Sequence, residues 1–206
     1  MLENTTQRWG SASKVLHWLL VLMICVEVPV GFLMALTYAP SLKYSDIVGL
    51  HDVLAQVHHT NGFFILLLFA VRLIWRLRYD VPLLPKDFGA LRHGLARANH
   101  WILYSLLLLV PLSGWAALSV LADTPQFGET HIWFFGSDSV PGILPPLALD
   151  HPYGYAFFAR IHRYLLILGG VVLACHVLAA LWHHWIRKDG LLLRMWPGTG
   201  PENTAD

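Results

Sequence analysis

Long apolar runs alternate with polar segments along the 206-residue chain. The runs predict four helices, at about 14–36, 53–76, 99–121 and 158–186. A run of about 20 apolar residues is long enough to cross the hydrocarbon core of a bilayer as a helix, and a helix satisfies its own backbone hydrogen bonds in lipid. The pattern therefore predicts an all-α integral membrane protein, a four-helix bundle that forms one domain over residues 1–206.

A secretory signal peptide is the competing interpretation of the first run, because Arg8 and Lys14 precede it. The run is longer than the apolar core of a typical signal peptide, contains Glu27, and lacks a clear small-residue cleavage site. We therefore expect an uncleaved first helix.

Composition supports the membrane class. Charged residues make up 13% of the chain and hydrophobic residues 56%, whereas soluble domains contain about 25% charged residues. Cys25 and Cys175 both fall within apolar runs, so we expect neither a disulfide framework nor a thiolate metal site. The net charge of +1 says nothing about nucleic acid, and no basic run with interleaved aromatic residues suggests that partner. The expected partner is membrane lipid.

The positions of Lys and Arg predict the orientation. We expect loops at 37–52 and 122–157, and these loops with their margins contain only Lys43, Arg160 and Arg163 as basic residues. The N-terminal tail, the middle loop and the C-terminal end contain the others. Basic segments stay in the cytoplasm, so both termini are expected there, which requires an even number of spans.

Two histidines lie in the last apolar run, His162 and His176, 14 positions apart. This spacing is almost four helical turns, so both imidazoles leave the same face, roughly 21 Å apart along the axis. Gly169 and Gly170 lie between them and remove side-chain bulk where a large flat group could approach. Ionisable side chains inside a membrane suggest a functional site. We interpret this helix as one wall of a site for two stacked haems.

The predicted orientation supplies a partner for each of these histidines. His162 lies near the outer side, and His176 lies deeper. His17 is near the cytoplasmic start of the first helix and can face His176. His58 and His59 are near the outer start of the second helix, and since they point about 100° apart, only one of them can face His162. Two imidazoles per iron leave no open coordination position, which is typical of electron transfer.

Other polar residues leave alternatives open. Glu27 is suited to proton uptake or release linked to quinone chemistry, or else lies near the wet end of its helix. His183, two turns after His176, either contacts a haem propionate or extends to the interface. Zinc is a weaker interpretation of the histidines, because no compact ligand cluster is evident.

Several motifs resemble the bacterial cytochrome b561 family of small, quinone-linked dihaem membrane proteins. The matching segments are LHWL at 16–19, HHTNG with FFILLLFAVRLIWRLRY at 58–79, GLARANHWILYSLLLLVPLSG at 94–114, and the run from IHRYL at 161 through CHVLAALWHHWIRKDGLLLRMWP to Pro197. The resemblance covers most of the chain, apart from the first loop and parts of the 122–157 loop, where the donor site is expected to differ.

The resemblance implies four axial ligands. It selects His58 over its neighbour, so that His58 and His162 would hold the outer haem b and His17 and His176 the inner one. It also implies that His100 lines a quinone or propionate site.

The resemblance further implies electron transfer in the bacterial inner membrane between an outer-face donor and ubiquinone. Some members are thought to oxidise superoxide, which would make this chain a superoxide:ubiquinone oxidoreductase. Arg160, Arg163 and Lys43 would then raise the local concentration of the anion; for the two arginines, propionate pairing and simple solvation are the alternatives. A cytochrome b subunit of a hydrogenase- or dehydrogenase-type complex and a haem-free membrane anchor or transporter are the rival functions.

Overall fold

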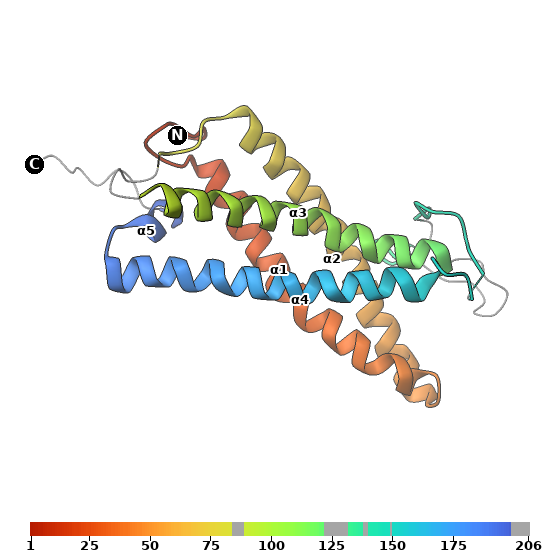
Figure 1. Ribbon diagram of the computed structural model, residues 1–206. Coiled ribbons are helices and arrows are strands. Elements are labelled where there is room, and N and C mark those ends of the chain that lie inside the picture. The colour runs from red at the N-terminus through yellow and green to blue at the C-terminus, as the bar shows by residue number, and fades with distance from the viewer. Residues whose placement is uncertain (84–88, 122–131, 138–139, 149, 199–206) are drawn as a thin grey trace, which may run out of the picture. The chain divides into compact units, whose positions relative to one another are not determined.

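A computed structural model of the chain describes residues 1–83, 89–121, 132–137, 140–148 and 150–198. The helices, in chain order, are α1 (Ser11–Ser41), α2 (Ser45–Arg78), α3 (Ala90–Leu121), α4 (Tyr155–Trp182), η1 (His183–Arg187) and α5 (Leu191–Met195) (Figure 1). No strand forms within the described ranges, although Phe134 and Ser137 make an isolated antiparallel bridge.

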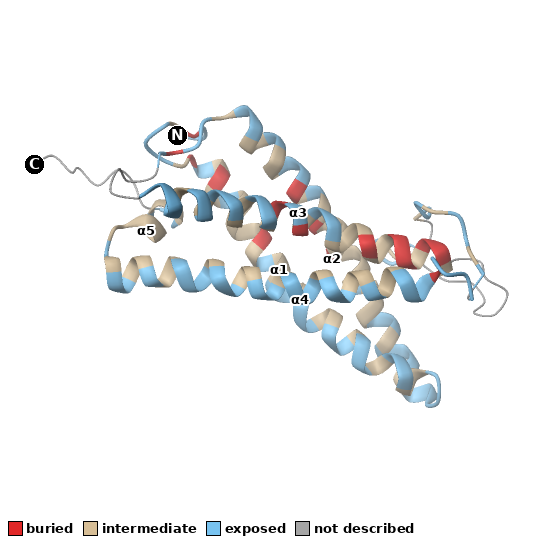
Figure 2. Cartoon of the chain, in the orientation of Figure 1, coloured by how far each residue is buried: buried red, intermediate tan, exposed pale blue. Residues whose placement is uncertain are grey.

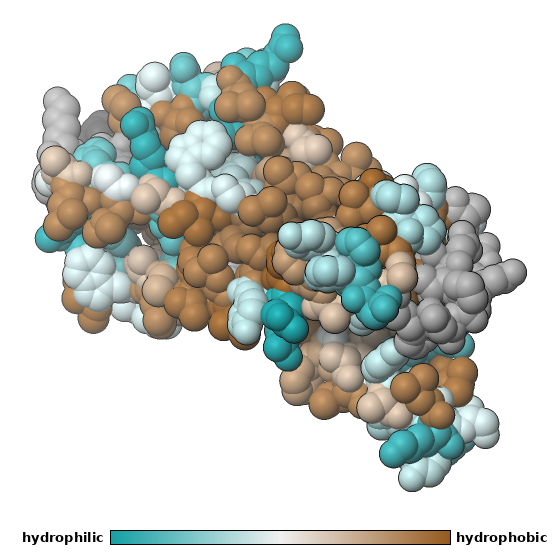
Figure 3. All heavy atoms as spheres, turned by 45° about the vertical axis from the view of Figure 1, so that its right-hand side comes forward, coloured by the Kyte–Doolittle hydropathy of each residue, from teal (hydrophilic) through white to brown (hydrophobic). Residues whose placement is uncertain are grey.

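Four helical segments are long and apolar enough to cross a membrane: α1, α2, α3, and α4 continued through η1. In their most apolar stretches only 0–33% of the residues are buried within the chain. Apolar side chains therefore cover much of the surface, as the space-filling view shows for one face (Figure 3). Such a surface is expected of helices that use lipid as their solvent. The prediction of an all-α membrane protein with four spans is confirmed.

The prediction of a loop at 37–52 is wrong. Only residues 42–44 separate α1 from α2, and the amides of Lys43 and Tyr44 donate to the carbonyl of Pro40 at 2.9 and 3.0 Å to close the turn. Hydropathy falls in this region, but polar residues continue a helix as readily as apolar ones. Asp46 also lies in the first turn of α2, where a negative charge stabilises the helix N-terminus.

The other helices also extend beyond the predicted bounds. The third helix was expected from residue 99 and begins at Ala90, and the segment 90–98 contains good helix formers. The fourth helix ends in the wide turn of η1, after which Lys188 adopts a left-handed conformation with φ 53°. The expected C-terminal tail forms the short helix α5 instead.

The chain divides into two compact units, and each long helix contributes a segment to both. Unit 1 comprises Met1–Leu19, Ala70–Ser105 and Leu168–Asp206. Unit 2 comprises Leu20–Phe69 and Leu106–Ile167. The single-domain prediction stays a prediction.

Unit 1 is held together by side chains that reach backbone carbonyls. The indole of Trp18 donates to the carbonyl of Met195 at 2.8 Å, which ties α5 to the start of α1. The Arg194 guanidinium donates to the carbonyl of Leu83 at 3.0 Å. The Met195 carbonyl is at the C-terminal end of α5, where the backbone lacks an intrahelical partner, and the Arg194 bond ties α5 to the connection that follows α2.

Unit 2 has its best-buried positions in the last turns of α3 (Figure 2). Val120 and Ser119 are each 1% exposed. The Ser119 hydroxyl accepts from the Ile143 amide at 2.9 Å and donates to the carbonyl of Trp115 at 2.6 Å. The indole of Trp115 donates to the carbonyl of Pro141 at 3.1 Å. These bonds fasten the described part of the long connection to α3.

The Ser119 contacts predict a stability effect. Ser119→Ala removes both bonds and leaves the Ile143 amide without its acceptor, which should cost about 1–3 kcal/mol of unfolding free energy. Thermal or denaturant unfolding in detergent measures this loss. Ser105→Ala, at an exposed position of the same helix, is the matched control and should change stability little. Equal stability of the two variants would contradict the assigned role of Ser119.

Candidate functional site

In unit 1, α1 and α4 bring His17 and His176 face to face. Their ring centroids are 6.3 Å apart, with an interplanar angle of 69°. Asn99 on α3 places its side-chain amide 3.2 Å from the Nδ1 atom of His176. The amide atom that faces the ring is the nitrogen Nδ2. A flip of the amide, which exchanges its nitrogen and oxygen, would let the carbonyl oxygen accept from an Nδ1–H group. Three helices thus converge on this histidine pair.

His100, the next residue on α3, lies beside the same pair. Its ring centroid is 5.6 Å from that of His176. Its Nδ1 atom lies 2.7 Å from the carbonyl oxygen of Ala96, one turn earlier in the same helix. Because a carbonyl only accepts, Nδ1 carries the hydrogen, and Nε2 of His100 keeps a lone pair that can accept a hydrogen bond.

In unit 2, α2 and α4 bring His58 and His162 together. Their ring centroids are also 6.3 Å apart, with an interplanar angle of 87°. Nδ1 of His162 lies 2.9 Å from the carbonyl oxygen of Val110 and 3.1 Å from the hydroxyl of Ser113, both on α3. The carbonyl requires a hydrogen on Nδ1, so Nε2 of His162 presents a lone pair.

The partner of His58 is Glu27 on α1. Nδ1 of His58 lies 2.8 Å from Oε1 of Glu27, although the contact does not meet the geometry of a hydrogen bond. The other carboxylate oxygen accepts from the amide of Asn61 at 2.8 Å. The Glu27 side chain is 16% exposed, so it lies among the helices. Its role in proton transfer stays a prediction.

A glycine follows one turn after the partner of His58 and one turn after the partner of His162. Gly31 lies four residues after Glu27, and a Cβ atom there would be 3.0 Å from Cε1 of His58. Gly114 lies four residues after Val110, and a Cβ atom there would be 3.2 Å from Cε1 of His162. In a helix the side chain at this spacing would cover the partner. Each glycine therefore lets an imidazole approach its partner closely.

The spacing of both pairs fits one iron between two imidazoles. A bond from a metal to an imidazole nitrogen is about 2 Å long, and the ring centre lies about 1 Å behind the nitrogen, so two axial rings have centroids roughly 6 Å apart. Both pairs have 6.3 Å. A Cβ atom at Gly169 or Gly170 on α4 would meet nothing within 4 Å, so the backbone is open there to a large flat group. The residues present fit haem.

The remaining candidate residues lie in different surroundings. Nδ1 of His59 accepts from the backbone amide of Trp133 at 3.4 Å, so His58 and not His59 faces His162. Nδ1 of His183 lies 2.5 Å from Asp189 at the end of the fourth span, and its contact with a propionate stays a prediction. The exposed basic residues of unit 2 include Lys43, Arg160 and Arg163.

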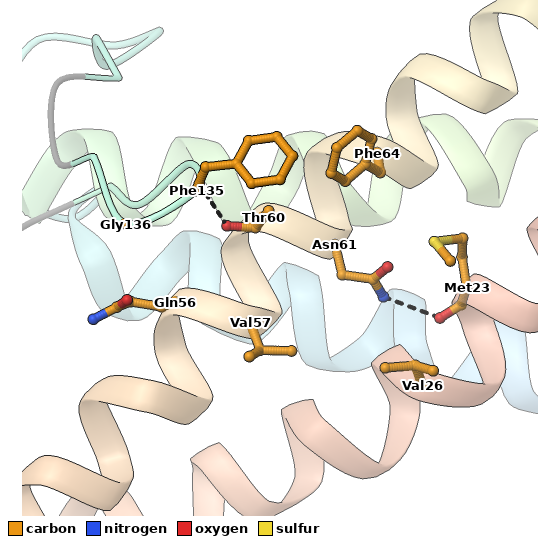
Figure 4. Close-up of a pocket in the computed structure, with 9 residues that line it drawn as sticks. All are labelled: Met23, Val26, Gln56, Val57, Thr60, Asn61, Phe64, Phe135 and Gly136. Atoms are coloured by element: carbon orange, nitrogen blue, oxygen red, sulfur yellow. Dashed lines mark hydrogen bonds between the residues drawn. The ribbon is translucent and has the colours of Figure 1, made fainter.

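Unit 2 contains a pocket of about 380 Å³. One of its lining residues is Asn61, which donates a hydrogen bond to Glu27. Its wall includes Asn61 and Phe64 of α2, Met23 of α1, and Phe135 (Figure 4). Phe135 is attached to α2 by a hydrogen bond from its amide to the hydroxyl of Thr60, at 3.1 Å. The lining is mainly apolar, with polar side chains from Gln56, Thr60 and Asn61.

Sequence reasoning missed the residues that orient the rings. No periodic signal marks these residues, and single small or amide residues are common in membrane helices. They are Asn99, Ser113, Gly31 and Gly114.

The acidic residues Asp123, Glu129 and Asp138 of the long loop lie outside the described residues.

Comparison with known proteins decides the family. Residues 8–198 match the family model described as prokaryotic cytochrome b561. The chain belongs to the prokaryotic cytochrome b561 family. The resemblance predicted from the motifs is confirmed, and with it a multi-pass bacterial membrane protein of haem-based electron transport.

Three curated relatives cover nearly the whole chain. The chain is 28% identical to the "Probable superoxide oxidase CybB" of Yersinia pestis over 88% of this chain and 92% of that protein. It is 29% identical to "Cytochrome b561 homolog 2" of Escherichia coli K12, over 93% of each protein. It is 28% identical to "Cytochrome b561 homolog 1" of the same organism, over 92% of this chain and 97% of the relative.

The adjacent histidines His58 and His59 give a matched test of the outer pair. His58→Ala removes a ring that faces His162 and should lower the haem content by one per chain, measured as the pyridine haemochrome. His59→Ala leaves that pair intact and should retain the wild-type content. Both variants must elute as single species in detergent. Loss of haem from the His59 variant with retention in the His58 variant would contradict the assignment.

Proposed function

We propose that this cytochrome b561 family member is a dihaem electron carrier between an outer-face donor and ubiquinone in the bacterial inner membrane. The observation that carries the proposal is the presence of two facing histidine pairs with the same 6.3 Å ring separation. His58 and His162 are the ligands of the outer haem b, and His17 and His176 are those of the inner one. Both termini face the cytoplasm.

When bound, each haem b supplies a one-electron carrier whose potential depends on its axial ligands and their hydrogen bonds. The protein's part is to fix the ligands. The carbonyl of Val110 holds the hydrogen on Nδ1 of His162, which leaves Nε2 for the metal. The amide of Asn99 does the same for His176 when its carbonyl oxygen faces the ring. Two such ligands per metal leave no position for oxygen or substrate, so the site is suited to electron transfer alone.

Superoxide is the donor that we infer. Lys43, Arg160 and Arg163 are exposed in the unit that contains the outer pair, and positive charge raises the local concentration of an anion. The name of the Yersinia relative, a probable superoxide oxidase, supports this donor. Two superoxide ions would lose one electron each to form oxygen, and ubiquinone would take up two electrons and two protons.

Quinone reduction requires groups that accept and release protons. His100 lies beside the inner pair, and we propose that it contacts the quinone or a propionate of the inner haem. Its Nε2 lone pair can accept from a quinol hydroxyl, and once protonated Nε2 can donate to a quinone or propionate oxygen. Glu27 is the second proton-linked candidate, beside the outer pair. His183 is proposed to contact a propionate of the inner haem from the end of the fourth span.

The donor assignment predicts a salt-sensitive rate. Replacing Lys43, Arg160 and Arg163 together with Gln should slow superoxide oxidation severalfold at low ionic strength and flatten its dependence on salt, because electrostatic steering is lost. The measurement is stopped-flow haem reduction by enzymatically generated superoxide, with a short-chain ubiquinone as the acceptor.

Arg92→Gln is the control, since Arg92 is an exposed cation of unit 1. It should leave the rate unchanged. If the triple variant keeps both the wild-type rate and the wild-type salt dependence, the proposed role of these cations is wrong. Reproducible co-purification with a large redox partner, without superoxide oxidation, would favour the subunit of a hydrogenase- or dehydrogenase-type complex.

A further inference from the structure

The two histidine pairs differ in the charge beside them. In unit 2, a carboxylate oxygen of Glu27 lies 2.8 Å from Nδ1 of His58. In unit 1, the neutral amide of Asn99 lies 3.2 Å from Nδ1 of His176. The same ring atom therefore faces an acidic group in one pair and an uncharged group in the other.

The Glu27 contact is built into the helices of unit 2. Asn61 is 8% exposed, and its amide donates to Oε2 of Glu27 at 2.8 Å and to the carbonyl of Met23 at 3.0 Å. These two bonds direct the other carboxylate oxygen toward His58, and Gly31 leaves room for the ring. The carboxylate acts on the ring through its charge, because Coulomb energy depends on distance and the two atoms are 2.8 Å apart.

The charge near the inner pair has the opposite sign. The Arg72 guanidinium donates to the carbonyl of Ser13 at 3.0 Å, one turn before His17 on α1. Ser13 is 5% exposed, so this arginine is anchored at a buried turn. Arg72 thus places a positive charge on the turn of α1 that precedes His17.

These charges have a predictable effect on bound haem. A carboxylate next to an axial imidazole makes the imidazole a more basic ligand, and its negative charge stabilises the more positive, oxidised iron. A nearby cation stabilises the reduced iron. Hydrogen bonding and local charge are two of the means by which a protein changes a haem potential.

We propose that Glu27 is a positioning residue that lowers the reduction potential of the haem between His58 and His162, and that Arg72 raises the potential of the haem between His17 and His176. The inference rests on the proposed function, because it requires both haems. The resulting difference in potential favours electron flow from the outer pair to the inner pair and on to quinone.

The test is a redox titration of the detergent-purified holoprotein, followed in the visible α-band and by the low-spin signals in electron paramagnetic resonance. Glu27→Gln should raise only the lower of the two midpoint potentials. The expected rise is about 59 mV, which corresponds to about a tenfold change in the one-electron equilibrium constant. Arg72→Gln should lower only the higher midpoint potential. Arg72→Lys keeps the positive charge and should therefore retain most of the wild-type value. Glu3→Gln, at an exposed carboxylate, should shift neither.

Two bound haems with unchanged midpoints in the Glu27 and Arg72 variants would overturn the inference while leaving the proposed function intact. A wild-type protein without two haems would instead overturn the proposed function. If Glu27→Gln loses haem, the two Arg72 variants decide. The inference is supported if Arg72→Gln lowers the higher of the two midpoint potentials and Arg72→Lys restores it. It is overturned if that midpoint potential stays unchanged in Arg72→Gln.

Discussion

An imidazole inside a membrane-spanning helix needs a partner for each ring nitrogen, because lipid offers none. The structure meets this need by pairing helices. Nδ1 of His162 reaches a carbonyl of α3, and Nδ1 of His58 reaches Glu27 of α1. In both cases the residue one turn after the partner is glycine, Gly114 or Gly31, so the backbone leaves room for the ring. The remaining nitrogen of each ring is then available for a metal.

The pair of His17 and His176 uses the same principle with different chemistry. Asn99 replaces a backbone carbonyl or a carboxylate as the partner of His176, and His100 lies beside the ring. Arg72 supplies positive charge from α2. The proposed direction of electron flow depends on this asymmetry of charge, while the shared ring separation explains how one fold would hold two haems of the same kind.

The sequence predicted most of the fold and part of the site. Apolar run length identified all four spans, and the 14-residue spacing of His162 and His176, combined with the charge of the loops, predicted which helices pair. Hydropathy missed the helix ends, since the residues near Lys43 and Ala90 are polar enough to resemble loops but remain helical. The residue spacing did not decide which of His58 and His59 faces His162. The resemblance to the family selected His58, which is the histidine that faces His162. Asn99 and the two glycines were not predictable, because a single contact between distant segments leaves no periodic pattern.

The central claim is that the chain holds two haems, each between one of the two histidine pairs. The most direct measurement is the haem b content per chain of the detergent-purified wild-type protein, by pyridine haemochrome, together with its reduced-minus-oxidised spectrum. We predict two haem b per chain, both low-spin. A single haem would contradict one histidine pair, and a protein without a Soret band would contradict the account.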